Sequence, residues 1–333
     1  MLEGFTTDYL PTTLRWAGVA IVMIALMIAT FWTLRRFKVR HEAAIGFVFT
    51  LPMTLNLLIF TLYPFLYSFY LSFTEFNMFQ APKWVGLTNY ITMFTNDTYF
   101  WPSCSLTLKY ALYSVPLSIV ASVAVALILN RPIKAVGFWR TLYYVPAVLP
   151  AAATMLLWRW MFAPNSGLIN YMLSPFLMLF GLQPPEWYTD PQLVLSVFVI
   201  TSLWGVFGAN SVILLAGLKN VPTELYEAAN LDGAGVLQKF RHITLPMISP
   251  ALFYTLITGI IGALQIFTQA FFMKIPAEMG SFLSVRIYQE AFQFSHFGYA
   301  AAMAWFMLIC IFLLTIIVFK SSSAWVYYEN EAK

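Results

Sequence analysis

Long apolar runs, separated by shorter polar segments, dominate the amino-acid sequence. The first run, residues 16–34, contains no charged side chain and is long enough for one bilayer crossing as an α-helix at about 1.5 Å per residue. Six further runs follow at residues 43–73, 106–129, 141–162, 192–218, 247–273 and 298–319. This pattern predicts an all-α polytopic membrane protein with about seven transmembrane helices.

Two segments depart from a simple span. Residues 43–73 exceed the length that a bilayer needs, and Pro52 and Pro64 predict a kink or an early end of the regular helix there. A later loop contains an apolar stretch, residues 168–182, which Pro175 interrupts and which is too short to cross. We expect this stretch to lie along the outer membrane surface as an interfacial helix.

Composition supports the membrane assignment. Hydrophobic residues make up 60% of the 333 residues, charged residues only 10%, and the mean hydropathy is +0.75, whereas a soluble domain carries about 25% charged residues. The formal net charge of +4 comes from dispersed basic residues, so it does not indicate a nucleic-acid-binding patch. Cys104 and Cys310 are too few for a disulfide framework.

Basic residues are distributed unequally between the two sides that alternating spans define. One side carries Arg35, Arg36, Lys38, Arg40, Arg131, Lys134, Arg140, Lys219, Lys239, Arg241, Lys320 and Lys333. The other side carries only Arg15, Lys83, Lys109, Arg159, Lys274 and Arg286. The positive-inside rule makes the richer side cytoplasmic, with the N-terminus outside and the C-terminus in the cytoplasm. Because the first basic cluster follows the first run, the reverse of a cleaved signal peptide, that run is expected to be retained.

A charged segment, residues 221–250 (VPTELYEAANLDGAGVLQKFRHITLPMISP), separates the fifth and sixth runs. Pro222 and Thr223 predict a helix start, followed by acids that suit the positive end of the helix dipole. The pair Asp232–Gly233 predicts the end of this helix, and a second short helix is expected after it. The segment is therefore expected to form a helix–turn–helix with a small apolar face, suited to docking in a groove of another protein.

This segment also resembles a known family. Its E-A-A and D-G-A triplets and the residues after them are similar to the coupling loop of permeases of binding-protein-dependent ABC importers, in particular sugar-type permeases such as the maltose and glycerol-phosphate permease subunits. The residues that carry the resemblance, expected to contact an ATPase, are Glu227, Ala228, Ala229, Asp232, Gly233, Ala234, Phe240, Leu245 and Pro246. Gly235 departs from the pattern but only adds flexibility at the turn.

The resemblance extends over residues 43–320, which would form a six-helix permease core. Further similar positions, in the segment that sugar permeases place around their middle spans, are Arg140, Pro146, Leu157, Trp158 and residues 167–170 (GLIN). The implied organisation is an extra N-terminal transmembrane helix with a basic cytoplasmic linker at 1–42, an ABC importer transmembrane domain at 43–320 with its coupling loop at 219–246, and a cytoplasmic tail at 321–333.

The family implies a multi-pass protein of a bacterial-type plasma (inner) membrane. With a second permease subunit it would form the pathway for a sugar, oligosaccharide or polyol-phosphate, together with two ATPase subunits and an extracytoplasmic solute-binding protein. ATP and Mg²⁺ are expected on the ATPase, and no cofactor on this chain, because the sequence has no G-x-x-x-x-G-K-[ST] phosphate loop. His41, His242 and His296 are isolated, and no Ser–His–acid set is apparent, so neither a metal site nor an enzyme is predicted.

The predicted spans hold few ionisable side chains. Lys109 and Arg159 lie near span ends, where they can reach the interface. Proton relays and charge-selective pores usually keep acidic side chains at depth, and none is found here. The sequence therefore favours an uncharged or weakly charged cargo.

Amide and aromatic side chains remain as candidates for the substrate pathway. Gln265 and Gln269 are four residues apart and are expected to share a helix face, with Thr268 beside them. Asn210 and Trp204 lie in the fifth run. Amides can bind sugar hydroxyls and a ring can stack on a sugar face, but the same amides can instead form hydrogen bonds between helices.

The alternative function is a self-contained secondary transporter or channel for a small neutral solute. It would require a coupling-ion site or an internal repeat, and the sequence displays neither. A membrane enzyme would require a catalytic cluster at bilayer depth, and the predicted spans contain no candidate for one.

Overall fold

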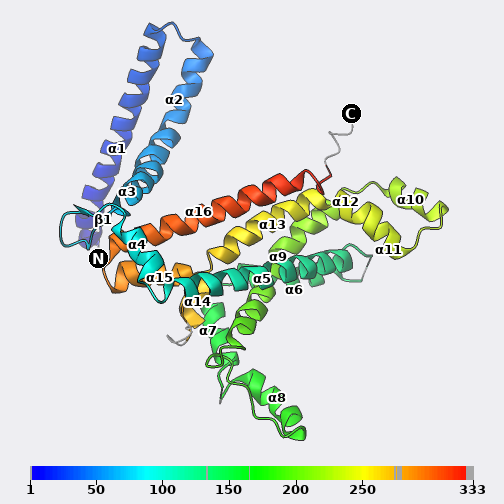
Figure 1. The fold of residues 1–333 in the computed structure, drawn as a ribbon. Coiled ribbons are helices and arrows are strands. Elements are labelled where there is room, and N and C mark those ends of the chain that lie inside the picture. The colour runs from blue at the N-terminus through cyan, green and yellow to red at the C-terminus, as the bar shows by residue number, and fades with distance from the viewer. Residues whose placement is uncertain (1, 133, 165, 274, 276–279, 328–333) are drawn as a thin grey trace. The chain divides into compact units, whose positions relative to one another are not determined.

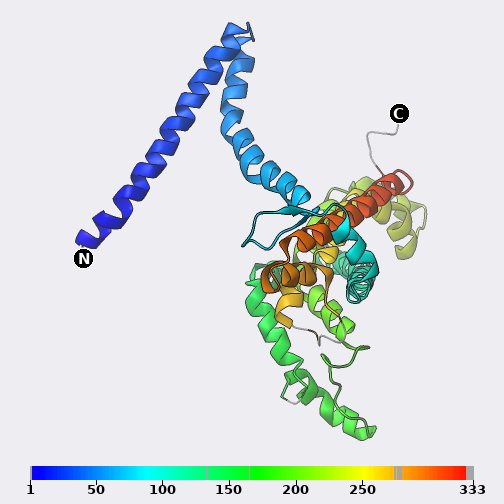
Figure 2. The same ribbon diagram turned by 60° about the vertical axis from the view of Figure 1, so that its left-hand side comes forward.

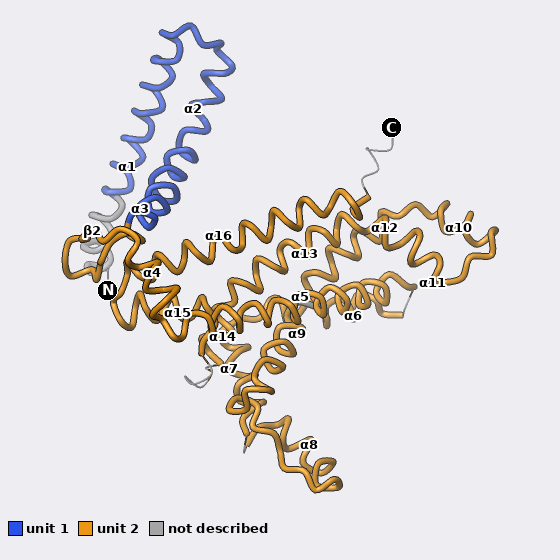
Figure 3. Tube along the Cα trace, in the orientation of Figure 1, with its two compact units in different colours: residues 1–70 blue, residues 71–333 orange. Residues whose placement is uncertain are grey.

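The computed structural model describes residues 2–132, 134–164, 166–273, 275 and 280–327, which are mostly helical (Figure 1). The chain divides into two compact units, residues 1–70 and residues 71–333 (Figure 3). Lys274 and residues 328–333, which belong to an expected outer loop and to the expected cytoplasmic tail, lie outside the described residues.

The first unit begins with two helices that lie side by side, α1 (Leu2–Arg36) and α2 (His41–Asn56). Lys38 adopts a left-handed conformation in the turn between them, with φ of 58°. The Phe31 ring packs edge-on against His41, with 5.7 Å between ring centroids. The first apolar run therefore forms a helix, as predicted.

The second apolar run continues as a helix with one irregular segment. α2 passes into a π-helical turn, η1 (Leu57–Leu62), and then into α3 (Tyr63–Leu71). Pro52 lies within α2, and Pro64 near the start of α3. Each proline removes a backbone donor, and the wider turn between them is where the helix departs from regular geometry. The three segments are together long and apolar enough for one span.

Helix α5 (Phe100–Leu129) is the centre of the second unit. It packs against α9 (Val194–Lys219) and α13 (Ser249–Leu264) (Figure 1). Small hydroxyl side chains, Ser118 and Ser122 among them, recur on its buried face at helical spacing. Such side chains allow neighbouring transmembrane helices to approach closely.

A short hairpin and a helix precede α5. The strands β1 (Thr74–Glu75) and β2 (Lys83–Trp84) pair antiparallel, and α4 (Thr88–Thr95) follows. The last long helix, α16 (Phe297–Ser322), begins against this hairpin. Gly298 is required at the contact, because a Cβ there would overlap the backbone carbonyl oxygen of Thr74.

The fourth run does not form one straight helix. α6 (Val136–Val148) and α7 (Ala151–Met161) meet at an angle of 95°. The span predicted over residues 141–162 is therefore bent, because Pro150 cannot donate the backbone hydrogen bond that would carry the helix across the junction. The next helix, α8 (Leu168–Leu179), is the predicted short apolar helix, and it lies away from α10 and α11 in both views (Figure 1, Figure 2).

The remaining elements follow α9 in chain order. They are α10 (Thr223–Leu231), α11 (Val236–Lys239), η2 (Phe240–Thr244), α12 (Leu245–Met247), α13, α14 (Thr268–Met273), α15 (Leu283–Tyr288), η4 (Gln289–Gln293) and α16. The helix–turn–helix predicted within residues 221–250 is confirmed.

The sixth run breaks where the sequence indicated a continuous helix. α13 ends at Leu264 and α14 begins at Thr268, so Gln265 and Gln269 do not share a helix face, and that prediction was wrong. The carbonyl of Ile266, in the break, accepts a hydrogen bond from the Ser284 hydroxyl. This tertiary partner satisfies a backbone group that a continuous helix would have paired internally.

Five helices in the described residues are long and apolar enough to cross a membrane, or up to seven if each of two bent pairs counts as one span. The bent pairs are α6 with α7, and the two parts of α9. The upper count agrees with the seven predicted spans. The side of the membrane on which each terminus lies stays a prediction.

Candidate functional site

A polar cavity of about 390 Å³ lies between α5, α9, α13 and α14. Its lining residues are Tyr110, Ser114, Val115, Ser118, Ser202, Asn210, Thr258, Gly259, Gly262, Ala263, Ile266 and Gln269. Hydroxyl and amide groups come from every one of these helices, and none of the described lining residues carries a charge. The cavity therefore presents hydrogen-bonding groups without a fixed charge.

Helix α5 provides one wall of the cavity. Tyr110, Ser114 and Ser118 are spaced four residues apart and so share one face of the helix. The Ser114 hydroxyl is buried on this face, one helical turn from Tyr110. This face of α5 therefore brings hydroxyl groups to the cavity from an otherwise apolar helix.

Gln269 of α14 joins the cavity to the surrounding helices. Its Nε2 donates to the Phe198 carbonyl oxygen at 2.8 Å and to the Thr201 hydroxyl. Its Oε1 accepts a long hydrogen bond of 3.4 Å from the Tyr110 hydroxyl. The side chain thus lines the cavity and forms hydrogen bonds between helices. Its role in a substrate pathway stays a prediction.

The other predicted pathway residues lie in different places. Asn210 lines the cavity. Gln265 is exposed at the end of α13, and Thr268 begins α14; neither is among the lining residues. Trp204 packs edge-on against Trp158 at 5.7 Å between centroids and is likewise not a lining residue.

Sequence reasoning missed several lining residues, namely Tyr110, Ser114, Ser118, Ser202 and Thr258. A signal was present in α5, where hydroxyl residues recur every fourth position within an otherwise apolar run. Such a polar stripe on a predicted span indicates a face turned toward other helices or a cavity instead of lipid.

The second candidate site is the polar loop of α10 to α12, which we call the coupling knob (residues 222–247). Gly233 ends α10 in the left-handed region, with φ of +73°. The Ala234 N–H donates to the Ala229 carbonyl oxygen at 2.9 Å and caps the helix. The side chain of Gln238 accepts from the Gly235 N–H at 2.7 Å and fixes the start of α11.

Within the coupling knob, α10 and η2 are joined on the side that faces α5 and α9. The hydroxyls of Tyr226 in α10 and Thr244 in η2 lie 2.8 Å apart in a hydrogen bond. Tyr226 and Ile243 also pack against the buried cluster at the ends of α5 and α9. The coupling knob is therefore in direct contact with two of the helices that line the cavity.

The outer side of the coupling knob is apolar and exposed. Leu231, Val236 and Leu237 are 91%, 78% and 77% exposed, respectively. Of the residues predicted for ATPase contact, Glu227, Ala228, Asp232, Gly233 and Leu245 are exposed, and Ala229, Ala234, Phe240 and Pro246 are half-buried. Exposed leucines at the tip of a polar loop are typical of a surface that binds a protein partner.

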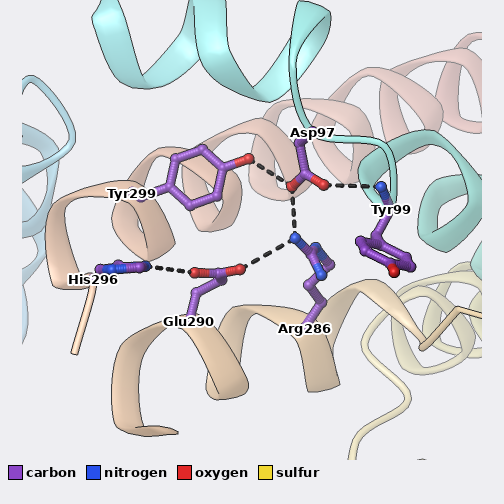
Figure 4. A network of polar contacts seen from close by, with 6 residues as sticks. All are labelled: Asp97, Tyr99, Arg286, Glu290, His296 and Tyr299. Atoms are coloured by element: carbon purple, nitrogen blue, oxygen red, sulfur yellow. Dashed lines mark hydrogen bonds and ion pairs between the residues drawn. The ribbon is translucent and has the colours of Figure 1, made fainter. Parts of the chain in front are cut away.

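A charged network ties the start of α5 to α15 and α16 (Figure 4). Asp97 Oδ2 accepts from Arg286 at 2.8 Å and from the Tyr299 hydroxyl at 2.7 Å. Arg286 also donates to Glu290 Oε1 at 3.1 Å, and Glu290 Oε2 lies 2.9 Å from His296 Nδ1. The network fixes α15. Phe282, directly before α15, packs edge-on against the Tyr110 ring. The network therefore also supports the cavity wall to which Tyr110 belongs.

Burial of Asp97 by itself would raise the pKa of its carboxyl group. Hydrogen bonds from Tyr299, Arg286 and the Tyr99 N–H, with the charge of Arg286, outweigh burial, so that the pKa is lowered. Because folding lowers this pKa, the carboxylate stabilises the folded state at pH values above its unfolded pKa of about 3.9, and this stabilisation is lost as the pH falls through the lower, folded pKa.

We expect Asp97→Asn to destabilise the protein at pH 7 by about 2 kcal/mol, because it removes one of the two carboxylates paired with the half-buried Arg286 and weakens the bond from Tyr299. Thermal unfolding of the detergent-solubilised protein measures the effect. The variant should also lose part of the acid-induced decrease in stability below about pH 4. The matched control is Asp190→Asn, whose carboxylate accepts only a local bond from the Gln192 N–H. Equal stability of the two variants at pH 7 would contradict the role of the network.

The family match and the relatives of this chain are all membrane components of transport systems. Residues 114–324 match the family described as binding-protein-dependent transport system inner membrane component. The probable ABC transporter permease protein YesP of Bacillus subtilis (strain 168) is 38% identical over 300 residues, which cover 88% of this chain and 95% of that protein. The arabinooligosaccharides transport system permease protein AraP of the same organism is 30% identical over 85% of this chain and 90% of its own length.

A solved structure has the same fold. It is a bacterial alginate ABC transporter in complex with an alginate pentasaccharide-bound periplasmic protein, and one of its chains superposes with a TM-score of 0.73 and 21% sequence identity. The superposition covers 87% of this chain and 96% of that chain.

Proposed function

The chain belongs to the family of binding-protein-dependent transport system inner membrane components, and from this premise we propose that it is a permease subunit of an ATP-driven importer of sugars or oligosaccharides. The family is a transport component, so the chain itself is not assigned a catalytic reaction. With a second permease it forms the translocation pathway, and ATP and Mg²⁺ bind to separate ATPase subunits.

The observation that carries the cargo assignment is the polar, uncharged cavity between α5, α9, α13 and α14. A sugar presents many hydroxyl groups and no net charge, and it matches walls of serine, threonine, asparagine and glutamine side chains. Among the lining side chains, the Asn210 amide and the Thr258 hydroxyl could bind such a ligand. The relative AraP, named for arabinooligosaccharide transport, supports this substrate class.

The proposed topology places the coupling knob in the cytoplasm. The excess of basic residues on that side supports this orientation, and it puts the exposed leucines of the knob where an ATPase can bind them. In the proposed cycle, closure of the ATPases on ATP moves the knob. The contact between Tyr226 and Thr244, and the packing of the knob on α5 and α9, transmit that movement to the cavity.

The remaining proposed partner is an extracytoplasmic solute-binding protein, which delivers the cargo to the outer loops. The family description supports this partner, since transport in this family depends on a binding protein. The extra N-terminal helix, the six-helix core and the inner-membrane location are part of the same proposal.

The test is affinity purification of the tagged chain from detergent, followed by mass spectrometry and an ATPase assay. We expect to recover a P-loop ATPase and a second permease, with ATPase activity that a sugar-loaded binding protein stimulates. Glu227→Arg, which reverses a charge on the exposed surface of α10, should abolish recovery of the ATPase but not of the second permease. Solute flux in liposomes that contain the purified chain alone would instead establish a self-contained transporter.

A further inference from the structure

A second cavity, separate from the polar one, is a groove between α6 and α9 with a volume of about 740 Å³. Its walls are mainly apolar and include Tyr144, Val148, Val212 and Leu215. The two helices are held close together here, because Gly208 of α9 lies against the backbone of Tyr143 in α6, where an added Cβ would be 2.6 Å from the carbonyl oxygen.

Two cationic side chains stand at one end of the groove. Arg140 lies near the start of α6, Lys219 is the last residue of α9, and both line the groove. The Arg140 Nε is buried and has no hydrogen-bond partner among the described residues. No ion pair to either side chain occurs in the part of the chain that the structure describes.

The helices that form the groove offer these cations no counter-ion; the nearest acid along the chain from Lys219 is Glu224, in α10. Residues 98–185 and 191–223, which include all of α5, α6 and α9, contain no aspartate or glutamate. Two further basic residues, Arg131 and Lys134, stand in the short loop between α5 and α6. Arg140 is half-buried and Lys219 is exposed. A cation that is partly removed from water is stabilised by a nearby anion, and for Arg140 that anion has to come from outside these helices.

We infer that this groove binds one anionic phospholipid of the bilayer, with its phosphate held by Arg140 and Lys219 and an acyl chain lying along α6 toward Val148. The guanidinium group matches the geometry of phosphate oxygens, and the ammonium group adds a point charge. Val148 lies eight positions after Arg140, about 12 Å along the helix. This length of apolar surface fits an acyl chain, and a free phosphate would leave it uncovered.

The charge of the headgroup decides the selectivity of this site. An acyl chain that moves from the bilayer into an apolar groove exchanges one hydrocarbon environment for another and gains little. Attraction of a basic pair to an anionic headgroup at the membrane surface is the larger effect. The site is therefore expected to prefer phosphatidylglycerol or cardiolipin over zwitterionic phosphatidylethanolamine.

Native mass spectrometry of the purified complex, titrated with phosphatidylglycerol or phosphatidylethanolamine, tests the inference. The complex should retain one phosphatidylglycerol with higher affinity than phosphatidylethanolamine. The double variant R140Q/K219Q should weaken phosphatidylglycerol binding about 30-fold, as expected from losing two headgroup cations. Lys83→Gln, which removes an exposed cation of β2, is the matched control and should bind as the unaltered complex does.

A second measurement does not depend on the folding of the double variant. A photo-crosslinking residue at Val148, in an otherwise unaltered chain, should form an adduct with an acyl chain. The inference is overturned by equal affinity for the two lipids, by unchanged phosphatidylglycerol binding in R140Q/K219Q, or by a crosslink from Val148 to the second permease. Displacement of the lipid by inorganic phosphate alone would assign the cations to a soluble anion instead.

Discussion

Gly233→Val is expected to reduce uptake to below about a tenth of its normal rate. Gly233 has φ of +73° at the end of α10, and a β-branched residue in that region costs about 1–3 kcal/mol. α10 has only nine residues, so its stability depends on this turn and on packing more than on the helix itself. The strained turn should displace the exposed leucines of the coupling knob and weaken binding of the ATPase.

Gly233→Asn is the matched control, because asparagine tolerates the left-handed region better than other residues do. It should retain most of the uptake. The measurements are uptake of labelled sugar in cells and recovery of the ATPase with the tagged chain. Normal uptake and normal recovery in Gly233→Val would contradict the docking role of the knob.

Gly262→Phe is expected to abolish uptake while the subunits still assemble. Gly262 lines the polar cavity, and a Cβ at this position would meet no atom within 4 Å. A phenyl ring can therefore enter the cavity without a clash at the backbone. It would occupy much of the space of about 390 Å³ and would bury an apolar group against the hydroxyls that a sugar needs.

Gly262→Ala is the corresponding control and should transport at close to the normal rate, because one methyl group leaves most of the cavity open. Recovery of the ATPase should be normal in both variants, which separates a blocked pathway from a misfolded chain. If Gly262→Phe imports sugar normally, the cargo passes elsewhere, and the cavity is a packing defect between helices.

The spans and the coupling knob were predictable from the sequence because local signals determine them. Uncharged apolar runs marked the helices that can cross a membrane, and Asp232–Gly233 marked the turn in which Gly233 adopts positive φ. The exposed apolar face of the knob follows from the same helix boundaries.

Other features depend on contacts between distant residues and had no local signal. The stretch Gln265–Phe267 contains neither proline nor glycine, and the helix breaks there where Ser284 bonds to the Ile266 carbonyl. Pro150 was visible, but its presence does not give the 95° angle between α6 and α7. The network of Asp97, Arg286 and Glu290 joins residues almost 200 positions apart in the chain.

The absence of charge on the described walls of the polar cavity has an electrical consequence. Each elementary charge that crosses a membrane potential of 100 mV changes the free energy by about 2.3 kcal/mol. A neutral sugar that passes uncharged walls carries no current, so the resting voltage of the cell neither drives nor opposes its entry. Accumulation of the cargo would then be set by the free energy of ATP hydrolysis alone, and it would persist in a depolarised cell for as long as ATP is supplied.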